Sequence, residues 1–278
     1  MSIKITATST CDLSPELVEA YQITIVPLYV SFGGNTYRDG VDTGPDDIFR
    51  HVEGGGTLPT TAAVNIADYQ ALFAELSPRY DAVLHITIGG SFSACYQNAC
   101  VAAEDFPNVY VVDSRNLTAG QGLLVLEAAE AARRGESIQD ILARLDELID
   151  KVDTTFVVDK LDYLAKGGRC SSVVALGANL LKLKPCIVLS DGKMSVGKKY
   201  RGAFDKVLPA YVRDQLDGKE IRKERAFITY TRCDPAIPAA VEQLVREYGF
   251  REIIHTNAGC TVSCHCGPNT LGVLFIRK

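Results

Sequence analysis

The sequence has no excess of positive charge. Its 29 lysines and arginines are outnumbered by 34 aspartates and glutamates, which gives the 278-residue chain a formal net charge of −5 at pH 7. We therefore expect no broad basic face and no nucleic acid partner. Apolar residues make up 47% of the chain and charged residues 23%, which is typical of a globular protein with a sizeable core.

Long apolar runs and secretory signals are also missing. No run approaches the roughly 20 apolar residues that a membrane-spanning helix needs, and residues 1–9 alternate like a strand and lack the pattern of a signal peptide. We therefore expect a cytoplasmic protein without stable membrane insertion, and a monomer. Most of the nine cysteines are expected to be buried and reduced, since disulfides persist mainly in oxidising compartments.

Strand and helix patterns alternate along the first half of the chain. Short β-rich apolar runs predict strands at Ile3–Ala7, Ile23–Val30, Ala82–Ile88 and Val109–Val112. The segments between and after them predict helices at 13–21, 65–76, 94–106, 117–135 and 137–150. Strands separated by helices indicate a mostly parallel sheet covered on both faces. Residues 1–153 are therefore predicted to form a three-layer α/β domain.

The pattern changes after residue 153. Further strands are predicted at 154–159, 226–231, 252–257 and 271–278, and helices at 161–169, 171–184 and 235–249, with one more helix before residue 226. Residues 186–201 are expected to form a hairpin that turns at Asp191-Gly192. Hairpins mixed with helices predict an α+β domain over residues 154–278.

Four polar stretches are expected to converge at one edge of the parallel sheet. TSTCD (8–12), GGSFSA (89–94) and DSRN (113–116) each follow a predicted strand, and LPTTAAVN (58–65) precedes a helix. Ligands of open parallel sheets bind beyond the carboxyl ends of the strands. Helix capping explains the serines, threonines and asparagines of any one loop, but the four together favour a ligand site.

The stretch GGSFSA is compatible with two functions. A serine hydrolase would use Ser91 or Ser93 as its nucleophile, because Gly89 and Ser91 fit part of the G-x-S-x-G elbow. Ser93 replaces the final glycine, however, and the required histidine would have to be His255 or His265, with no acid indicated. Alternatively, Ser93 is the N-cap of the next helix, where its hydroxyl and the free N–H groups would hold a carboxylate or phosphate.

A cluster near the C-terminus allows a third hypothesis. Cys260, Cys264, His265 and Cys266 could bind a metal ion. Zinc sites usually contain spaced pairs such as CxxC, and no second pair accompanies this cluster. We therefore expect no metal and no other cofactor.

Two longer stretches carry a family resemblance. LDYLAKGGRCS (161–171) matches L-x-x-L-x-x-G-G-R-I-S, and LLKLKPCIVLSDGK (180–193) matches L-x-x-I-K-P-I-x-x-x-D-G. Shorter matches are TSTCDL, TAAV, GGSFSACY, VDS and HCGPNTLG. Taken in order, these segments resemble the DegV family, the fatty-acid-binding proteins that include the binding subunit of bacterial fatty acid kinase. The resemblance extends over essentially the whole chain.

The resemblance implies a function and a site. A long-chain fatty acid (C14–C18) would lie in an apolar tunnel contributed by the second domain, with its carboxylate hydrogen-bonded by Thr61 and Ser93 in loops of the first. His265 would lie close to this head group, and Arg169 would support it or contact a kinase. The kinase would phosphorylate the bound carboxylate to an acyl phosphate for phospholipid metabolism, so the chain itself would not be an enzyme. Weaker candidates for the site are Ser9, Ser114 and Arg201.

The chain departs from the family pattern around this proposed site. Thr8 replaces an aspartate, Gly89-Gly90 replace two serines, Ala94 replaces a glycine, and Ala62-Ala63-Val64 replace S-Q-P. The polar shell around the head group is therefore expected to be thinner than usual, whereas Thr61 and Ser93 are retained.

Overall fold

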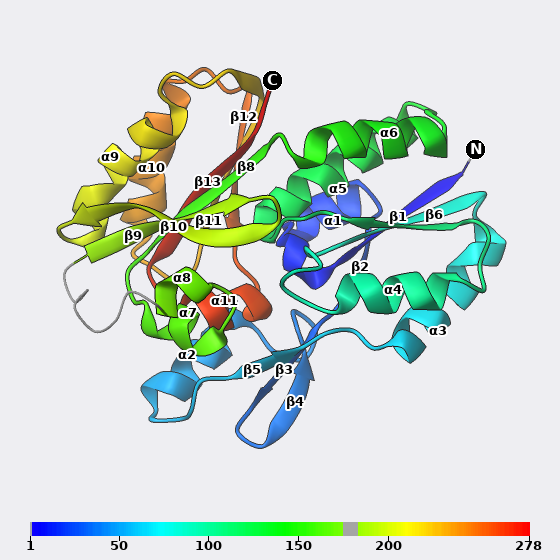
Figure 1. Cartoon of the computed structure of the whole chain (residues 1–278), viewed down its shortest axis with the longest axis horizontal. Coiled ribbons are helices and arrows are strands. Elements are labelled where there is room, and N and C mark those ends of the chain that lie inside the picture. The colour runs from blue at the N-terminus through cyan, green and yellow to red at the C-terminus, as the bar shows by residue number, and fades with distance from the viewer. Residues whose placement is uncertain (1, 175–182) are drawn as a thin grey trace.

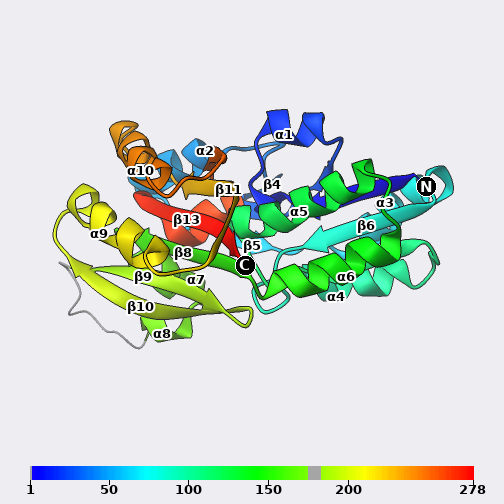
Figure 2. The same cartoon turned by 90° about the horizontal axis from the view of Figure 1, so that it is seen from above.

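The structure is a computed structural model that describes residues 2–174 and 183–278. Within these residues the strands form three sheets, and the two halves of the chain lie side by side along the longest axis of the molecule (Figures 1 and 2). None of the described helices has the length and apolarity needed to cross a membrane.

The first half contains a four-stranded parallel sheet in the order β2-β1-β6-β7. Its strands are β1 (Ile3–Thr8), β2 (Thr24–Val26), β6 (Ala82–Thr87) and β7 (Val109–Asp113). The helices on one face are α1 (Pro15–Ala20), α5 (Thr118–Arg133) and α6 (Ile138–Ile149) (Figure 1). Those on the other are α3 (Ile66–Leu76) and α4 (Cys95–Ala103), and the connections include the short 3₁₀ helices η1 (Ser9–Cys11) and η2 (Ser77–Arg79). The predicted three-layer α/β arrangement is confirmed.

A small antiparallel sheet, which the sequence did not predict, projects from this half. Its order is β4-β3-β5, and its elements are β3 (Tyr29–Phe32), β4 (Asn35–Arg38) and β5 (Thr60–Ala62), with α2 (Pro45–Glu53) between β4 and β5. Thr60 and Thr61 therefore lie in a strand, and their predicted placement in a loop is wrong.

The single strand predicted at Ile23–Val30 is also wrong, because the chain changes sheets at Pro27. Residues before this proline pair with β1, and those after it pair with β4 and β5. Proline has no N–H to donate to a sheet. The next N–H, that of Leu28, donates to Ser9 Oγ at 3.1 Å, so the parallel ladder ends here.

The second half contains a six-stranded mixed sheet in the order β10-β9-β8-β13-β11-β12, in which only the β11–β12 pair is parallel. Its strands are β8 (Val152–Val158), β9 (Leu183–Ser190), β10 (Lys193–Arg201), β11 (Ile221–Tyr230), β12 (Glu252–Asn257) and β13 (Thr270–Arg277). Helices α9 (Phe204–Leu216) and α10 (Ala236–Arg246) pack on one face. Helices α7 (Asp162–Gly167), α8 (Ser171–Val174) and α11 (Cys260–Cys266) lie toward the other (Figure 1). The predicted α+β character is confirmed.

The hairpin predicted around Asp191-Gly192 is confirmed, and both residues adopt the positive φ that such a tight turn requires. The helix predicted at 171–184 begins as α8, but β9 starts at Leu183, so residues 183 and 184 are strand. Residues 175–182 lie outside the described residues. Lys184 pairs with Tyr200 across the hairpin, which fixes the register at the beginning of β9.

One helix belongs to the cores of both halves. Thirteen of the sixteen residues of α5 are buried, and α5 contacts β1 and β6 of the parallel sheet and β8, β11 and β13 of the mixed sheet. Two glycines allow this close packing: a Cβ at Gly120 would lie 2.3 Å from Thr154 Oγ1, and one at Gly122 would lie 2.7 Å from the carbonyl oxygen of Cys11. The domain boundary near residue 153 stays a prediction.

Candidate functional site

A cavity of about 60 Å³ lies where β5, the loop after β6, α7 and α11 meet. Its apolar lining comes from both halves of the chain and includes Leu28, Ile88, Phe92, Leu117, Leu164, Met194, Val262 and Cys266. Its polar lining consists of Thr61, Ser93, Arg169, Thr261 and His265. The fold therefore brings four of the sequence candidates, Thr61, Ser93, Arg169 and His265, to one apolar cavity.

Thr61 is placed by the small sheet. Its backbone pairs with Val30 in the middle of β3, and its Oγ1 lies 2.9 Å from Nε2 of His265. Thr60, the preceding residue, is exposed, whereas Thr61 is half-buried. This difference follows from the alternation of side chains along a strand, and it directs the second hydroxyl of the PTT stretch toward the cavity.

His265 lies in the last turn of α11, against Gly167. Its Nδ1 is buried without a hydrogen-bond partner among the described residues, and a Cβ at Gly167 would lie 2.3 Å from it. Burial, aided by the positive charge of Arg169, lowers the pKa of His265 to about 4, so the imidazole is neutral at pH 7. A proton on Nε2 donates to Thr61 and avoids a buried, unpaired N–H. The Thr61 hydroxyl then keeps its own proton for a ligand.

Ser93 lies in the turn between β6 and α4. The prediction that it is the N-cap residue is wrong, because that position is occupied by Ala94. The Cys95 N–H nevertheless donates to Ser93 Oγ at 3.3 Å, and the Ser93 hydroxyl donates to Cys95 Sγ at 3.2 Å. Sulfur is a weak acceptor, so an incoming carboxylate would replace it readily.

An open cleft of about 540 Å³ adjoins the cavity. Thr61, Arg169 and His265 line both spaces, so they form the boundary between an apolar interior and an open exterior. Arg169 follows Gly168, whose φ of +67° ends α7, and its guanidinium donates to the carbonyl oxygens of Gly167 at 2.8 Å and Phe92 at 3.5 Å. Its side chain thereby spans the two halves at the mouth of the cavity.

A smaller cavity of about 20 Å³ adjoins the first. Leu117, Val262 and Cys266 line both cavities and separate them. The far lining of the inner cavity includes Gly272 and Leu274 of β13. The two cavities therefore mark an apolar path from the Thr61–His265 contact toward the mixed sheet.

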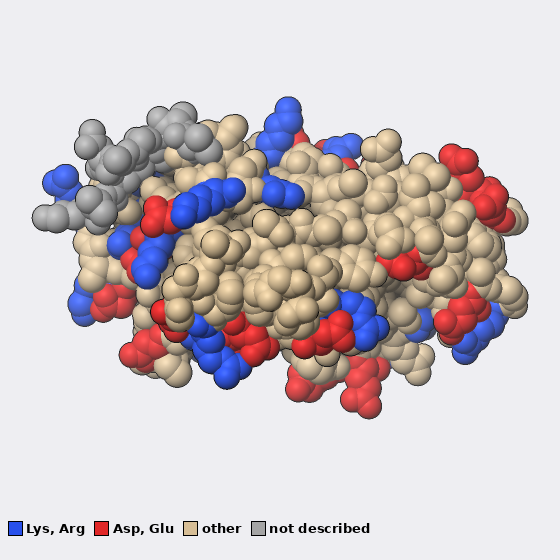
Figure 3. All heavy atoms as spheres, turned by 90° about the horizontal axis from the view of Figure 1, so that it is seen from below, with Lys and Arg blue, Asp and Glu red and all other residues tan. Residues whose placement is uncertain are grey.

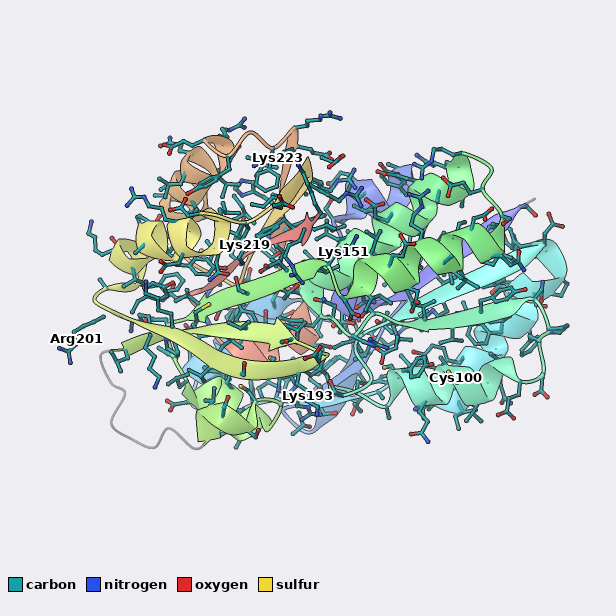
Figure 4. All side chains as sticks on the ribbon, turned by 45° about the horizontal axis from the view of Figure 1, so that its top comes forward. Cys100, Lys151, Lys193, Arg201, Lys219 and Lys223 are labelled. Atoms are coloured by element: carbon teal, nitrogen blue, oxygen red, sulfur yellow. The ribbon has the colours of Figure 1, made fainter. Side chains whose placement is uncertain are left out.

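The three weaker candidates lie outside this lining. Ser9 Oγ donates to Asp39 Oδ2 at 3.2 Å, and the buried Ser114 Oγ donates to the carbonyl oxygen of Asn116 at 3.1 Å. Arg201 ends β10, seven residues and roughly 23 Å along the strand from the cavity residue Met194. Figure 4 shows the Arg201 side chain at the edge of the mixed sheet, pointing away from the fold.

Neither serine of the GGSFSA stretch is hydrogen-bonded to a histidine within the described residues. Ser91 donates to the carbonyl oxygen of Gly192, and Ser93 is bonded to Cys95. His265 contacts Thr61, and His255 contacts Glu242 at 3.0 Å. The arrangement that a serine hydrolase uses to activate its nucleophile is therefore not formed at either serine.

The cysteine cluster forms most of α11. Cys260, Cys264 and Cys266 are buried, and burial raises the pKa of each thiol, that of Cys266 to about 12. Cys260 Sγ donates to the carbonyl oxygen of Thr43 at 3.3 Å. In the part of the chain that the structure describes, no three histidine, cysteine or acidic side chains are grouped as metal ligands would be.

The surface seen from below in Figure 3 has a broad uncharged centre, and lysine, arginine and acidic side chains lie mostly around it. Positive and negative side chains alternate along these margins. Among the residues that the structure describes, this face therefore has no continuous basic patch of the kind that binds a nucleic acid backbone.

Comparisons with known proteins give a consistent result. Residues 2–278 match the family model described as "Uncharacterised protein, DegV family". A DegV domain-containing protein of Caldanaerobacter subterraneus subsp. tengcongensis is 31% identical over 280 residues, covering 99% of each chain. The solved structure of a fatty-acid-binding DegV family protein from Thermus thermophilus has a TM-score of 0.90 at 33% identity, covering 100% of both chains. A stearic acid-binding protein from Eubacterium ventriosum has a TM-score of 0.83 at 30% identity, with coverage of 99% and 98%.

Proposed function

Because the chain belongs to the DegV family, we propose that it is a carrier that binds a long-chain fatty acid between its two halves. The carboxylate accepts hydrogen bonds from the hydroxyls of Thr61 and Ser93, and the acyl tail occupies the apolar path behind them. The observation that carries this proposal is the position of the Thr61–His265 contact at the mouth of an apolar cavity. Fatty acid binding by relatives from Thermus thermophilus and Eubacterium ventriosum supports it.

The head group is held by uncharged donors. A neutral His265 donates to Thr61, and the hydroxyl proton of Thr61 then points to the carboxylate. The Ser93 hydroxyl gives up its weak hydrogen bond to Cys95 Sγ and donates to the other side of the carboxylate instead. Hydrogen bonds to a charged group contribute about 1.5–3 kcal/mol each. Two such bonds compensate part of the cost of taking the carboxylate out of water.

The acyl tail supplies most of the binding free energy. Burying about 14 methylene groups gains roughly 11 kcal/mol at about 0.8 kcal/mol each, from which the ordering of the chain and the loss of free translation subtract several kcal/mol. The two cavities, of about 60 and 20 Å³, are smaller than such a tail. Side chains that line the cavities must therefore move apart as the tail enters, and the flexible Met194, in the lining of the larger cavity, is suited to this adjustment.

The open cleft outside the carboxylate suits phosphorylation by a partner. A kinase subunit would transfer the terminal phosphoryl group of ATP to a carboxylate oxygen, forming an acyl phosphate and releasing ADP. Arg169 borders both the cavity and the cleft, so its guanidinium would face the added charge. In this scheme the chain positions the substrate, and the partner performs the chemistry.

Lipid extraction tests the proposal directly. Protein purified from bacterial cells is denatured, and we expect mass spectrometry to detect about one C14–C18 fatty acid per chain. Delipidated protein should bind palmitate or stearate in a calorimetric titration. Ser93→Ala should weaken this binding, whereas Ser91→Ala is the matched control, because Ser91 lies two residues away and bonds to Gly192 outside the cavity lining.

Two results would contradict the proposal. One is wild-type protein that carries no lipid and takes up none. The other is hydrolysis of a nitrophenyl ester that is lost in Ser93→Ala, which would instead establish the hydrolase. The kinase step is tested separately: with a fatty acid kinase catalytic subunit and ATP, hydroxylamine trapping should detect acyl phosphate with wild type and less with Arg169→Gln.

A further inference from the structure

Two buried acidic side chains from the first half of the chain cap the first turn of α11. Gly259, the N-cap residue, has no side chain to accept the free N–H groups of this turn. Its own N–H donates to Asp12 Oδ1 at 2.9 Å. The N–H groups of Cys260 and Thr261 donate to Asp39 Oδ1 and Oδ2 at 2.8 and 3.1 Å. The start of α11 is thus fixed by residues more than 200 positions away.

Hydroxyl groups complete the hydrogen bonding of both carboxylates. Thr118 donates to Asp12 Oδ2 at 2.5 Å, and Ser9 and Thr261 donate to Asp39 Oδ2 at 3.2 and 2.7 Å. Every carboxyl oxygen of the two side chains therefore accepts at least one hydrogen bond. Burying two acids is costly unless their oxygens are satisfied in this way, so the arrangement depends on α11 being in place.

The small sheet β4-β3-β5 consequently contacts α11 near both of its ends. Asp39 directly follows β4 and binds the first turn of the helix, and Thr61 of β5 contacts His265 in the last turn. Asp39 is also tied to the sheet, because its N–H donates to the carbonyl oxygen of Leu28 at 2.8 Å. The separation of Thr61 Oγ1 and His265 Nε2 is therefore set partly by where Asp39 holds the helix.

We propose that Asp39, supported by Asp12, is a positioning residue for the carboxylate site: it fixes α11 against the sheet that carries Thr61 and so keeps His265 within hydrogen-bond distance of the Thr61 hydroxyl. The inference rests on the proposed function, because Thr61 is the residue proposed to bind the ligand. Neither aspartate lines the cavity, so both act through α11 without touching the fatty acid.

Asp39→Asn is the informative substitution. Four donors share the two oxygens of Asp39, and asparagine has only one side-chain oxygen. At least one N–H or O–H group of α11 then loses its acceptor. We expect the affinity for palmitate to fall about tenfold, the loss that corresponds to one hydrogen bond to a charged group.

A double-mutant cycle separates positioning from a general loss of stability. If Asp39 acts through His265, Asp39→Asn should change palmitate affinity less than about twofold in a His265→Ala background. Equal losses in the two backgrounds would overturn the proposal. Glu130→Gln is the matched control: it removes an ion pair between the halves, to Arg225 at 2.8 Å, that does not involve α11, and it should leave affinity unchanged.

A spectroscopic measurement keeps the test independent of ligand binding. The chain has four histidines, so the imidazole ¹⁵N signals of His265 can be assigned by comparison with His265→Ala. Asp39→Asn should shift its Nε2 signal, and the signal should stay in place in Glu130→Gln. If Asp39→Asn does not fold, Asp12→Gly serves instead, because it removes the acceptors of the Gly259 N–H and the Thr118 hydroxyl, and glycine suits the left-handed backbone at this position, where φ is 48°. An unmoved signal in a folded variant refutes the positioning role, whereas wild type that binds no lipid refutes only the proposed function.

Discussion

His265 Nε2 and Thr61 Oγ1 lie 2.9 Å apart, although 204 residues separate them in the sequence. The contact joins a helix of the second half to a strand of the first, at the mouth of the apolar cavity. Because the neutral imidazole can donate to Thr61, it leaves the threonine proton available to a carboxylate.

Removing the hydroxyl of Thr61 should weaken fatty acid binding strongly. Thr61→Val keeps the branched shape that β5 accommodates but deletes the donor to the carboxylate. We expect an affinity loss of about tenfold to a hundredfold, which corresponds to about 1.5–3 kcal/mol, measured by calorimetric titration with palmitate. The control is Thr60→Val on the same strand, whose side chain is exposed. Equal losses in the two variants would show that the effect belongs to the strand and not to the hydroxyl.

Alanine substitutions at the two glycines before Arg169 should have different effects, one on ligand affinity and the other on stability. A Cβ at Gly167 would lie 2.3 Å from His265 Nδ1, so Gly167→Ala should displace the imidazole and reduce palmitate affinity. Gly168 has a φ of +67° with nothing within 4 Å of an added Cβ. Gly168→Ala should therefore cost only about 1 kcal/mol of stability through backbone strain. Thermal unfolding and ligand titration of both variants check this; wild-type affinity in Gly167→Ala would contradict it.

A bulky side chain between the two cavities should select against long tails. Val262 lines both cavities, and Val262→Phe would fill the passage between them. We expect stearate to bind much more weakly while an acid of about eight carbons loses little, together with about 1–3 kcal/mol of destabilisation from overpacking. Val101→Phe, at a position 41% exposed on α4, controls for the added ring. If the affinity for both acids fell equally, the acyl tail would not run past Val262.

Asp12 should make stability fall as pH rises. Burial raises its pKa to about 8 in the folded protein from an ordinary value of 3.8; the charge of Asp39 adds to the rise, and hydrogen bonds from Thr118 and Gly259 oppose it. Between about pH 4 and 8 the folded state therefore holds a proton that the unfolded state releases. This contributes a decline of up to about 1.4 kcal/mol per pH unit in the free energy of unfolding.

Asp12→Asn removes this titration and suits the left-handed backbone at this position, where φ is 48°. The difference in unfolding free energy between wild type and variant should therefore shift in favour of the variant from about pH 5 to pH 8. Urea unfolding followed by circular dichroism measures both proteins. Parallel pH profiles would mean that Asp12 is ionised throughout.

The sequence predicted the elements whose signals are local. Long apolar strands, amphipathic helices and the Asp191-Gly192 turn depend on neighbouring residues, and the structure contains them. The small sheet was missed because its strands have only three or four residues and β4 is largely exposed, which leaves no apolar alternation to detect. The predicted N-cap of α4 was wrong by one residue, because Ala94 occupies that position. The Ser93 hydroxyl accepts a hydrogen bond from the Cys95 N–H instead.

Some residues of the site could be identified from sequence motifs, whereas others could be identified only from the fold. The resemblance marked Thr61, Ser93, Arg169 and His265, and all four line the cavity. No local pattern indicated that Gly167 must lack a side chain because His265 packs against it. Asp39 was equally hidden, because an aspartate beside a glycine is typical of an exposed turn, whereas here it is buried against a helix from the other half of the chain.

The burial of α5 has a consequence for how the protein unfolds. This helix contributes Leu123 and Leu126 to a core that also contains Phe227 and Leu274 of the mixed sheet. Neither half can therefore expose that interface without losing apolar contacts that stabilise the other. The two halves should melt in one cooperative transition, and a fragment that ends at residue 150 would be expected to aggregate in solution.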